Sequence, residues 1–275
     1  MSKLYIVGTP IGNLGDLSPR AARTLADCDF IAAEDTRVTA KLLHHLGIST
    51  PMVSYHEHNR RQSGEQILRR LQAGETCALV TDAGMPAVSD PGEDLIRACH
   101  EAGVAVESVP GPAAFVTALA LSGFAGGRFT FEGFLSVNRR GRAAHLDSLA
   151  DETRTMLFYE APHKLAATLR DFAAAFGPRP LAIVREITKL HEEVIRTDCR
   201  KAAEDYADGG LKGEIVLVLA GAEPAQSEPL PLAEAARLAR DYLAEGLSAP
   251  EAAKRAAKES GRRKNEIYAV LAKED

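Results

Sequence analysis

Long apolar runs are missing from this sequence, and no stretch approaches about 18 uninterrupted apolar residues, so we expect no membrane-spanning helix. Tryptophan is absent, and the four cysteines show neither paired CxxC spacing nor a disulfide framework. The first residues run straight into an apolar segment, without the basic and apolar pattern of a signal peptide. We therefore expect reduced thiols in a cytoplasmic protein, and the length of 275 residues favours two domains.

Excess positive charge is also missing. The net charge is −5, which argues against a wholly basic nucleic-acid coat but leaves room for a local basic patch. Two basic segments stand out in this acidic chain: Arg139–Arg142, and six basic residues between Lys254 and Lys264. Either alone is typical of a solvated face, whereas the two together favour contact with an RNA backbone.

The spacing of possible metal ligands is incomplete. His191-Glu192 begins like the zinc-binding pattern H-E-x-x-H, but position 195 is isoleucine and the segment alternates like a strand. His56 and His58 would share one face of a strand, and no third ligand is visible near them. We expect no metal ion, and a polar loop that faces a substrate fits residues 54–59 as well.

Three loops rich in proline and glycine follow apolar segments that are typical of buried strands. They are Gly8-Thr9-Pro10, Asp82-Ala83-Gly84-Met85-Pro86 and Pro110-Gly111-Pro112. In open α/β sheets ligands bind beyond the carboxyl ends of the strands, and glycine lets backbone approach a ligand closely. The loops match neither G-x-G-x-x-G nor G-x-x-x-x-G-K-[ST], which counts against a dinucleotide site or a P-loop. They favour a small-molecule pocket lined largely by backbone, with ordinary turns at a sheet edge as the alternative.

Apolar strands and helices alternate along the first half of the chain. Strands are expected near 3–8, 30–33, 51–55, 76–81 and 104–109. Ser18-Pro19 starts a helix, with serine as the N-cap and proline at the first helical position. This order predicts βαβ units and a mostly parallel sheet.

The second half predicts another α/β domain, with a mixed sheet. We divide the chain into an N-terminal α/β domain over residues 1–112, a second α/β domain over 113–221, and an extension over 222–275. Residues 222–231 are typical of a linker. Apolar spacing over 232–273 predicts three short helices, similar to a small helix-turn-helix unit.

Charged side chains follow several of these strands. Glu34, Asp35 and Arg37 suit the orientation of a polar substrate or proton transfer, and an exposed helix N-terminus is the alternative. Asp82 suits a cationic centre or a donor on a ligand, or else caps its own turn. We interpret Asp90 as a cap for the following helix. Lys189 suits phosphate binding, deprotonation of a hydroxyl, or a surface ion pair.

Eight motifs taken together resemble one family. They are Leu4–Leu14, Ala33–Arg37, Ser54–Asn59, Val80–Gly92, Val109–Pro112, Phe158–Lys164, Arg185–Lys189 and Lys212–Glu214. They are similar to the bacterial ribose-2'-O-methyltransferases of small-subunit ribosomal RNA, within the tetrapyrrole methylase superfamily. The resemblance covers residues 3–221 in order, and the tail resembles the helical extension of that subgroup.

The resemblance implies two α/β domains of the tetrapyrrole methylase type with a cleft between them, plus a small helical C-terminal extension. It implies S-adenosylmethionine in that cleft, a homodimer, and methylation of the 2'-hydroxyl of a decoding-centre cytidine in 16S rRNA of the small ribosomal subunit. By the same match the cofactor would lie against Gly8–Pro10, Asp82–Pro86 and Pro110–Pro112.

Methyl transfer to a ribose hydroxyl requires in-line alignment and removal of a proton from a weakly acidic group. The candidate residues for handling the proton are Glu34, Asp35 and Lys189, with Arg37 placing a phosphate or the ribose. Two alternatives stay open. A tetrapyrrole C-methyltransferase would keep the fold and cofactor, but it gives no use for a basic tail. A non-catalytic RNA-binding ribosome assembly factor would use the pocket as a sensor.

Overall fold

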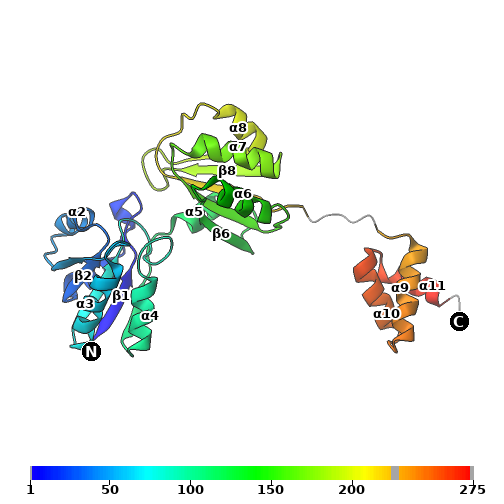
Figure 1. Ribbon diagram of the computed structural model, residues 1–275, viewed down its shortest axis with the longest axis horizontal. Helices are drawn as coiled ribbons and strands as arrows, with labels where there is room; N and C mark the ends of the chain where they lie inside the picture. The colour runs from blue at the N-terminus through cyan, green and yellow to red at the C-terminus, as the bar shows by residue number, and fades with distance from the viewer. Residues whose placement is uncertain (1, 224–228, 273–275) are drawn as a thin grey trace. The chain divides into compact units, whose positions relative to one another are not determined.

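The chain divides into two compact units, Met1–Gly221 and Ala222–Asp275. The computed structural model describes residues 2–223 and 229–272. The first unit holds two five-stranded sheets, which Figure 1 shows in blue to cyan and in green to yellow. Within the described residues, no helix is long and apolar enough to cross a membrane.

The first sheet is wholly parallel and has the strand order β3-β2-β4-β1-β5. Its strands are β1 (Lys3–Val7), β2 (Phe30–Ala33), β3 (Met52–Ser54), β4 (Thr76–Val80) and β5 (Ala105–Val109). The connections hold a 3-10 helix η1 (Leu14–Asp16) and four α-helices, α1 (Pro19–Asp27), α2 (Thr36–Leu46), α3 (Arg60–Gln72) and α4 (Glu93–Glu101). Because the strands are parallel, the loops that follow them all emerge at one edge of the sheet.

Both faces of this sheet carry a buried apolar core, as expected for parallel strands between two layers of helices. One face carries a core that includes Leu4, Phe30 and Leu79, and the other a core that includes Val7 and Ile31. β2 and the last four residues of β4 are fully buried, which explains their continuous apolar sequence.

The second sheet is mixed and has the strand order β6-β7-β10-β8-β9. Its strands are β6 (Phe129–Phe134), β7 (Thr155–Glu160), β8 (Pro180–Arg185), β9 (Glu193–Asp198) and β10 (Ile215–Leu219). β6 and β7 pair in parallel, and the other pairs are antiparallel. The helices are α5 (Ala114–Ser122), α6 (Arg139–Ser148), α7 (Leu165–Phe176) and α8 (Cys199–Asp205). Residues of α6, α7 and α8 pack on one face of the sheet and residues of α5 on the other.

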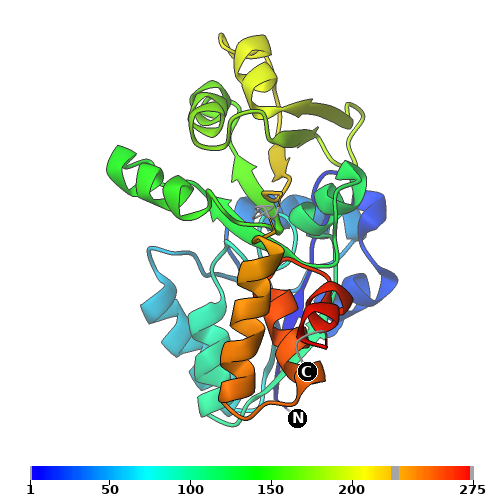
Figure 2. The same ribbon diagram turned by 90° about the vertical axis from the view of Figure 1, so that its right-hand side faces the viewer.

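The second unit is a bundle of three helices, α9 (Leu232–Ala244), α10 (Ala249–Ser260) and α11 (Lys264–Leu271). Figure 2 shows them in orange to red. Buried alanines of α9 and α10 pack around Ile267, and small side chains let the helices approach closely. Ser248 and Glu251 form a capping box at the start of α10. Of the predicted linker, residues 224–228 lie outside the described residues.

The predicted α/β class, with a parallel first sheet and a mixed second sheet, is confirmed. Ser18 caps α1 as predicted, because its side chain accepts a hydrogen bond from Ala21 N. The three predicted C-terminal helices form, and Gly261 ends the second of them in the left-handed region, with φ of 69°.

Candidate active site

Backbone hydrogen bonds join the loops at the carboxyl edge of the first sheet. Thr9 N donates to Gly84 O at 3.0 Å, and Gly84 N donates to Thr9 O at 3.1 Å. Thr9 Oγ1 also donates to Thr81 O at 3.1 Å. Gly111 N lies 3.3 Å from Met85 Sδ, which brings in the third loop. The three segments that the sequence singled out therefore form one surface.

Gly8 and Gly111 touch backbone to backbone. A Cβ added to Gly8 would lie 2.6 Å from Gly111 Cα, and a Cβ added to Gly111 would lie 2.7 Å from Gly8 Cα. Real Cβ atoms do not approach backbone so closely, so the contact between the loops after β1 and β5 requires glycine on both sides.

Two loops hold residues in the left-handed region of φ, where side chains other than glycine are strained. Ala87 and Ser89, after β4, have φ of 66° and 63°. Glu186 and Thr188, between β8 and β9, have φ of 51° and 65°. Ser89 and Ile187 both line the same cavity. Such strain clusters at functional sites, so it marks both loops as parts of a candidate site.

A cavity of about 470 Å³ lies between the first-sheet loops and the second sheet. Five carboxylates line it, and among the described residues no lysine, arginine or histidine does. The carboxylates belong to Glu34, Asp82, Asp90, Glu160 and Glu214. A cavity with this charge favours a positively charged ligand.

Burial and mutual repulsion raise the pKa values of the acids from the first sheet. Burial raises the pKa of Asp90 to about 6, and the carboxylates of Glu34 and Asp82 add to the shift. The pKa of Glu34 is raised by burial and then by Asp82. The pKa of Asp82 is also raised, mainly by burial. These three acids form an acidic cluster whose charge a bound cation would stabilise.

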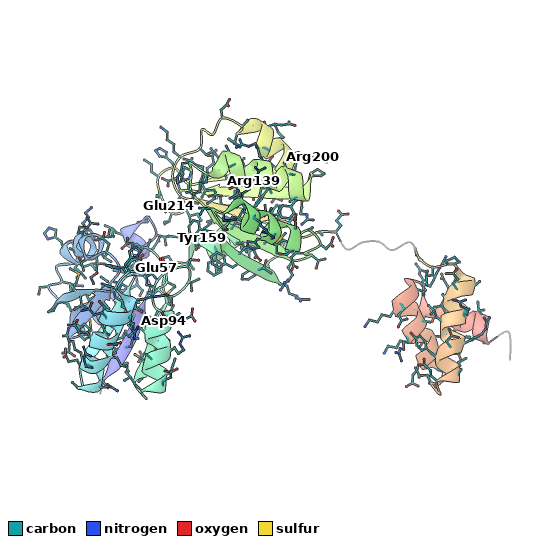
Figure 3. All side chains as sticks on the ribbon, in the orientation of Figure 1. Glu57, Asp94, Arg139, Tyr159, Arg200 and Glu214 are labelled. Atoms are coloured by element: carbon teal, nitrogen blue, oxygen red, sulfur yellow. The ribbon has the colours of Figure 1, made fainter. Side chains whose placement is uncertain are left out.

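Aromatic rings form another wall of the cavity. Phe115, Phe134 and Tyr159 line it, and the rings of Phe134 and Tyr159 have centroids 5.4 Å apart. Phe134 is 60% exposed, which is unusual for so large an apolar side chain. Figure 3 labels Tyr159, which is on β7, and Glu214, which directly precedes β10. The wall offers flat surfaces for a planar ring.

Glu160 is held in the cavity wall by a buried network. It is 6% exposed and accepts hydrogen bonds from Thr168 Oγ1 and, at 2.8 Å, from Ala161 N. Arg142 Nη2 donates to Thr168 Oγ1 at 2.7 Å, and Arg142 Nε donates to Asp171 at 2.5 Å. The guanidinium of Arg142 is therefore already paired within the fold, whereas Arg139 and Arg140 of the same predicted RNA-contacting run are exposed.

Of the acids predicted to handle protons, only Glu34 lines the cavity. Asp35 is the N-cap of α2 and accepts hydrogen bonds from Arg37 N at 2.8 Å and Arg37 Nη2 at 2.6 Å. The side chain of Arg37 is 88% exposed. Asp35 N in turn donates to Asp82 Oδ1 at 3.1 Å, so the backbone of Asp35 positions an acid that does line the cavity.

Lys189 lies beside the cavity, where it connects the two sheets. Its Nζ is 3.0 Å from Glu186 Oε1 and 3.1 Å from Glu214 Oε2. Burial lowers the pKa of Lys189, but the hydrogen bonds to these two acids outweigh it and leave the pKa above its ordinary value. The ammonium is therefore charged at neutral pH. A Cβ on Gly12 would lie 2.5 Å from Lys189 Cγ, so the lysine stem packs on the loop after β1.

The predicted cofactor-binding residues fall into two groups. Asp82, Ala83, Gly84 and Met85 line the cavity. The others are absent from its lining, although the contacts described above join several of them to Gly84 and Met85. They are Gly8, Thr9, Pro10, Pro86, Pro110, Gly111 and Pro112.

The interpretation of Asp90 as a helix cap is wrong. Gly92 is the N-cap of α4, no side chain caps that helix, and Asp90 lines the cavity. The left-handed turns at Ala87 and Ser89 precede it, and a sequence does not reveal such turns where no glycine stands. The aromatic wall and Glu160 were not predicted, because Phe134, Tyr159 and Glu160 belong to the second sheet and Phe115 to α5, and only the fold brings them to the first-sheet loops.

We expect replacement of Asp90 by asparagine to stabilise the ligand-free protein above pH 6. The pKa of Asp90 in the folded chain, about 6, exceeds its unfolded value, so its contribution to stability is present below about pH 4 and is lost as pH rises through 6. Asp90→Asn removes that loss. Thermal unfolding midpoints at pH 4.5 and 8 check this, with Asp147→Asn as an exposed control. A difference from wild type that is equal at both pH values would contradict it.

Comparison with known proteins identifies the family. The profile of the Tetrapyrrole (Corrin/Porphyrin) Methylases matches residues 3–203. A protein of Synechocystis sp. named Ribosomal RNA small subunit methyltransferase I is 46% identical over 269 residues, 98% of this chain and 96% of the relative. Proteins of the same name from Xylella fastidiosa and Escherichia coli O157:H7 are 45% and 43% identical, over 96% and 97% of this chain and 97% and 93% of their own lengths.

Solved structures agree on the fold. A cobalt precorrin-4 methyltransferase matches with a TM-score of 0.60 and 18% identity, over 80% of this chain and 95% of its own. Uroporphyrin-III C-methyltransferase of Thermus thermophilus, solved with S-adenosylhomocysteine, matches with a TM-score of 0.57 and 20% identity, over 79% of this chain and 97% of its own. The chain therefore belongs to the tetrapyrrole methylase family, in the branch that holds the relatives named ribosomal RNA small subunit methyltransferase I.

Proposed function

We propose that this protein transfers the methyl group of S-adenosylmethionine to the 2'-hydroxyl of a cytidine in the decoding centre of 16S rRNA, on the small ribosomal subunit in the cytoplasm. The names of relatives 40–46% identical support the ribosomal RNA substrate. The observation that carries the cofactor is the cavity between the two sheets, lined by five carboxylates, three aromatic rings and no basic side chain of the described residues.

The cavity fits S-adenosylmethionine in size and charge. Its volume of about 470 Å³ lies within the usual range for small-molecule sites. The acidic cluster of Glu34, Asp82 and Asp90 matches the positive sulfonium, and the aromatic wall matches a planar adenine. Thr81 Oγ1 is buried at the end of β4 without a hydrogen-bond partner in the described structure. When bound, the cofactor supplies a methyl group activated by a positively charged sulfur.

The backbone loops would hold the cofactor, and their rigidity would supply alignment. Thr9 and Gly84 fix the first two loops to each other, and the Gly8–Gly111 contact fixes the third. Correct placement of reacting groups accounts for a large part of the rate in such displacements. We assign the predicted loop residues outside the cavity lining to this supporting role.

Glu34 is our candidate for the group that accepts the proton of the ribose hydroxyl. It lines the cavity, and its raised pKa makes its carboxylate a better base near neutral pH. Asp35 is occupied by Arg37, and the charged ammonium of Lys189 has no free lone pair. We assign Asp35 to the positioning of Asp82, Arg37 to contact with the RNA, and Lys189 to the joint between the sheets.

Loss of this gene from its host organism tests the function. We expect one 2'-O-methylcytidine to disappear from the small-subunit rRNA, and a plasmid copy of the gene to restore it. Mass spectrometry of nuclease digests detects the change. An unchanged methylation map would contradict the proposal and return attention to a tetrapyrrole substrate or to a sensor without turnover.

We further propose that the protein acts as a homodimer. α5 packs on the second sheet with one face, yet Val116 and Leu121 on the same helix are 48% and 39% exposed. Phe129 on the edge strand β6 is 37% exposed. Association would cover these apolar side chains. Light scattering should give twice the mass of the chain, and Val116→Asp with Leu121→Asp should lower it to that of a monomer. A wild-type monomer at micromolar concentration would contradict the dimer.

A further inference from the structure

The acidic cavity poses a problem for an RNA substrate. RNA carries one negative charge per phosphate, and basic side chains normally provide the contacts to that backbone. The cavity between the first-sheet loops and the second sheet is called the main cavity below. Among the described residues, all charged side chains that line it are carboxylates. The phosphates next to the target ribose therefore need cations outside the cavity.

A second cavity, of about 550 Å³, provides such cations on the second sheet's side of the unit. His163, Arg170 and Lys212 line it, and all three are exposed. Within the described part of the chain, no hydrogen bond or ion pair engages the side chains of these three residues. Among the described residues, Asp208 is the one acid in its lining. Arg170 and Lys212 place two unpaired cations around one hollow, and the ring of His163 adds a hydrogen-bonding group, so the hollow favours an anionic ligand.

The two cavities adjoin. Pro162 lines both of them, and His163 is the next residue of the same segment. On the other side Lys212 lies two residues before Glu214, which lines the main cavity. The second cavity therefore lies next to the cavity that would receive the ribose.

The backbone of the second cavity is held in place. Arg185 Nη2 and Nε donate to Lys212 O at 2.8 Å and 3.0 Å, and Arg185 Nη1 lies 3.1 Å from Glu193 Oε2. Gly209 and Gly210 have φ of 84° and 108°, so the loop adopts a path that residues with a Cβ rarely take. The hollow is thus part of the folded chain.

We propose that the second cavity binds phosphates of the RNA strand that flanks the methylated ribose, through Arg170, Lys212 and His163. This inference rests on the proposed function for the identity of the RNA. Phosphate contacts carry no base information, so the site would fix the strand's position while the main cavity selects the nucleoside.

Equilibrium binding of the full-length protein to purified small ribosomal subunits lacking the modification tests the proposal. Arg170→Ala with Lys212→Ala should weaken binding, and the slope of log affinity against log salt should fall by about 1 for each cation removed. Arg170→Glu, which reverses one charge, should weaken binding more than Arg170→Ala alone. Lys41→Ala with Arg69→Ala removes two exposed cations of α2 and α3 that line neither cavity, and it should bind like wild type.

Unchanged affinity and salt slope in the Arg170/Lys212 variant would overturn the proposal, as would an equal loss in the Lys41/Arg69 control. Thermal unfolding midpoints equal to wild type exclude a folding defect. Binding is measured without turnover, so the result does not depend on methyl transfer. Absence of methyl transfer by wild type would instead contradict the proposed function and leave the binding result valid.

Discussion

Replacement of Gly111 by alanine is expected to weaken S-adenosylmethionine binding by about 10- to 100-fold. The new Cβ would lie 2.7 Å from Gly8 Cα and 2.8 Å from Gly8 O, so the loops after β1 and β5 must separate. Overpacking of this kind costs about 1–3 kcal/mol, and about 1.4 kcal/mol corresponds to tenfold in affinity. Calorimetric titration with S-adenosylmethionine measures the effect.

Gly127→Ala is the matched control. A Cβ at Gly127 meets nothing within 4 Å, and the residue is exposed. This variant should bind the cofactor like wild type. If Gly111→Ala also binds like wild type and unfolds at the same temperature, the contact between Gly8 and Gly111 does not shape the cofactor site.

Glu34→Gln is expected to lower the rate of methyl transfer by about 100-fold or more, the usual contribution of a positioned general base. Cofactor affinity should change much less, because Asp82 and Asp90 still line the cavity. The raised pKa of Glu34 predicts a wild-type rate that rises with pH as this carboxyl ionises, above the range of an ordinary glutamate. Single-turnover rates across pH 4.5–8 measure both effects.

The control for Glu34 is Glu101→Gln. Glu101 is an exposed acid at the end of α4, and it lines neither cavity. It should leave rate and pH profile unchanged. A Glu34→Gln enzyme with the wild-type rate and pH profile would show that another group accepts the proton.

Local sequence patterns predicted the first sheet well, because β2 and β4 are short buried apolar runs and glycine or proline adjoins β1, β3 and β5. The loops at Gly8, Asp82 and Gly111 were found for the same reason. A parallel sheet brings the carboxyl ends of all its strands to one edge, so these loops lie close enough to form hydrogen bonds with one another.

Local sequence patterns did not predict the aromatic wall of the cavity. Phe134 and Tyr159 reach the site only because β6 and β7 pair in parallel and the second sheet faces the loops of the first. The ion pair of Arg142 was not predicted, because its partner Asp171 lies on a different helix. Asp90 was misread because the turns before it are left-handed without glycine. Each miss depends on contacts between distant segments.

The most direct test of the central claim is transfer of labelled methyl from S-adenosylmethionine to purified small ribosomal subunits that lack the modification, followed by digestion to nucleosides. The cavity and the family predict label in 2'-O-methylcytidine alone, greatly reduced with Glu34→Gln. Bound cofactor with no label in RNA, or label on a base, would contradict methylation of a ribose at this site.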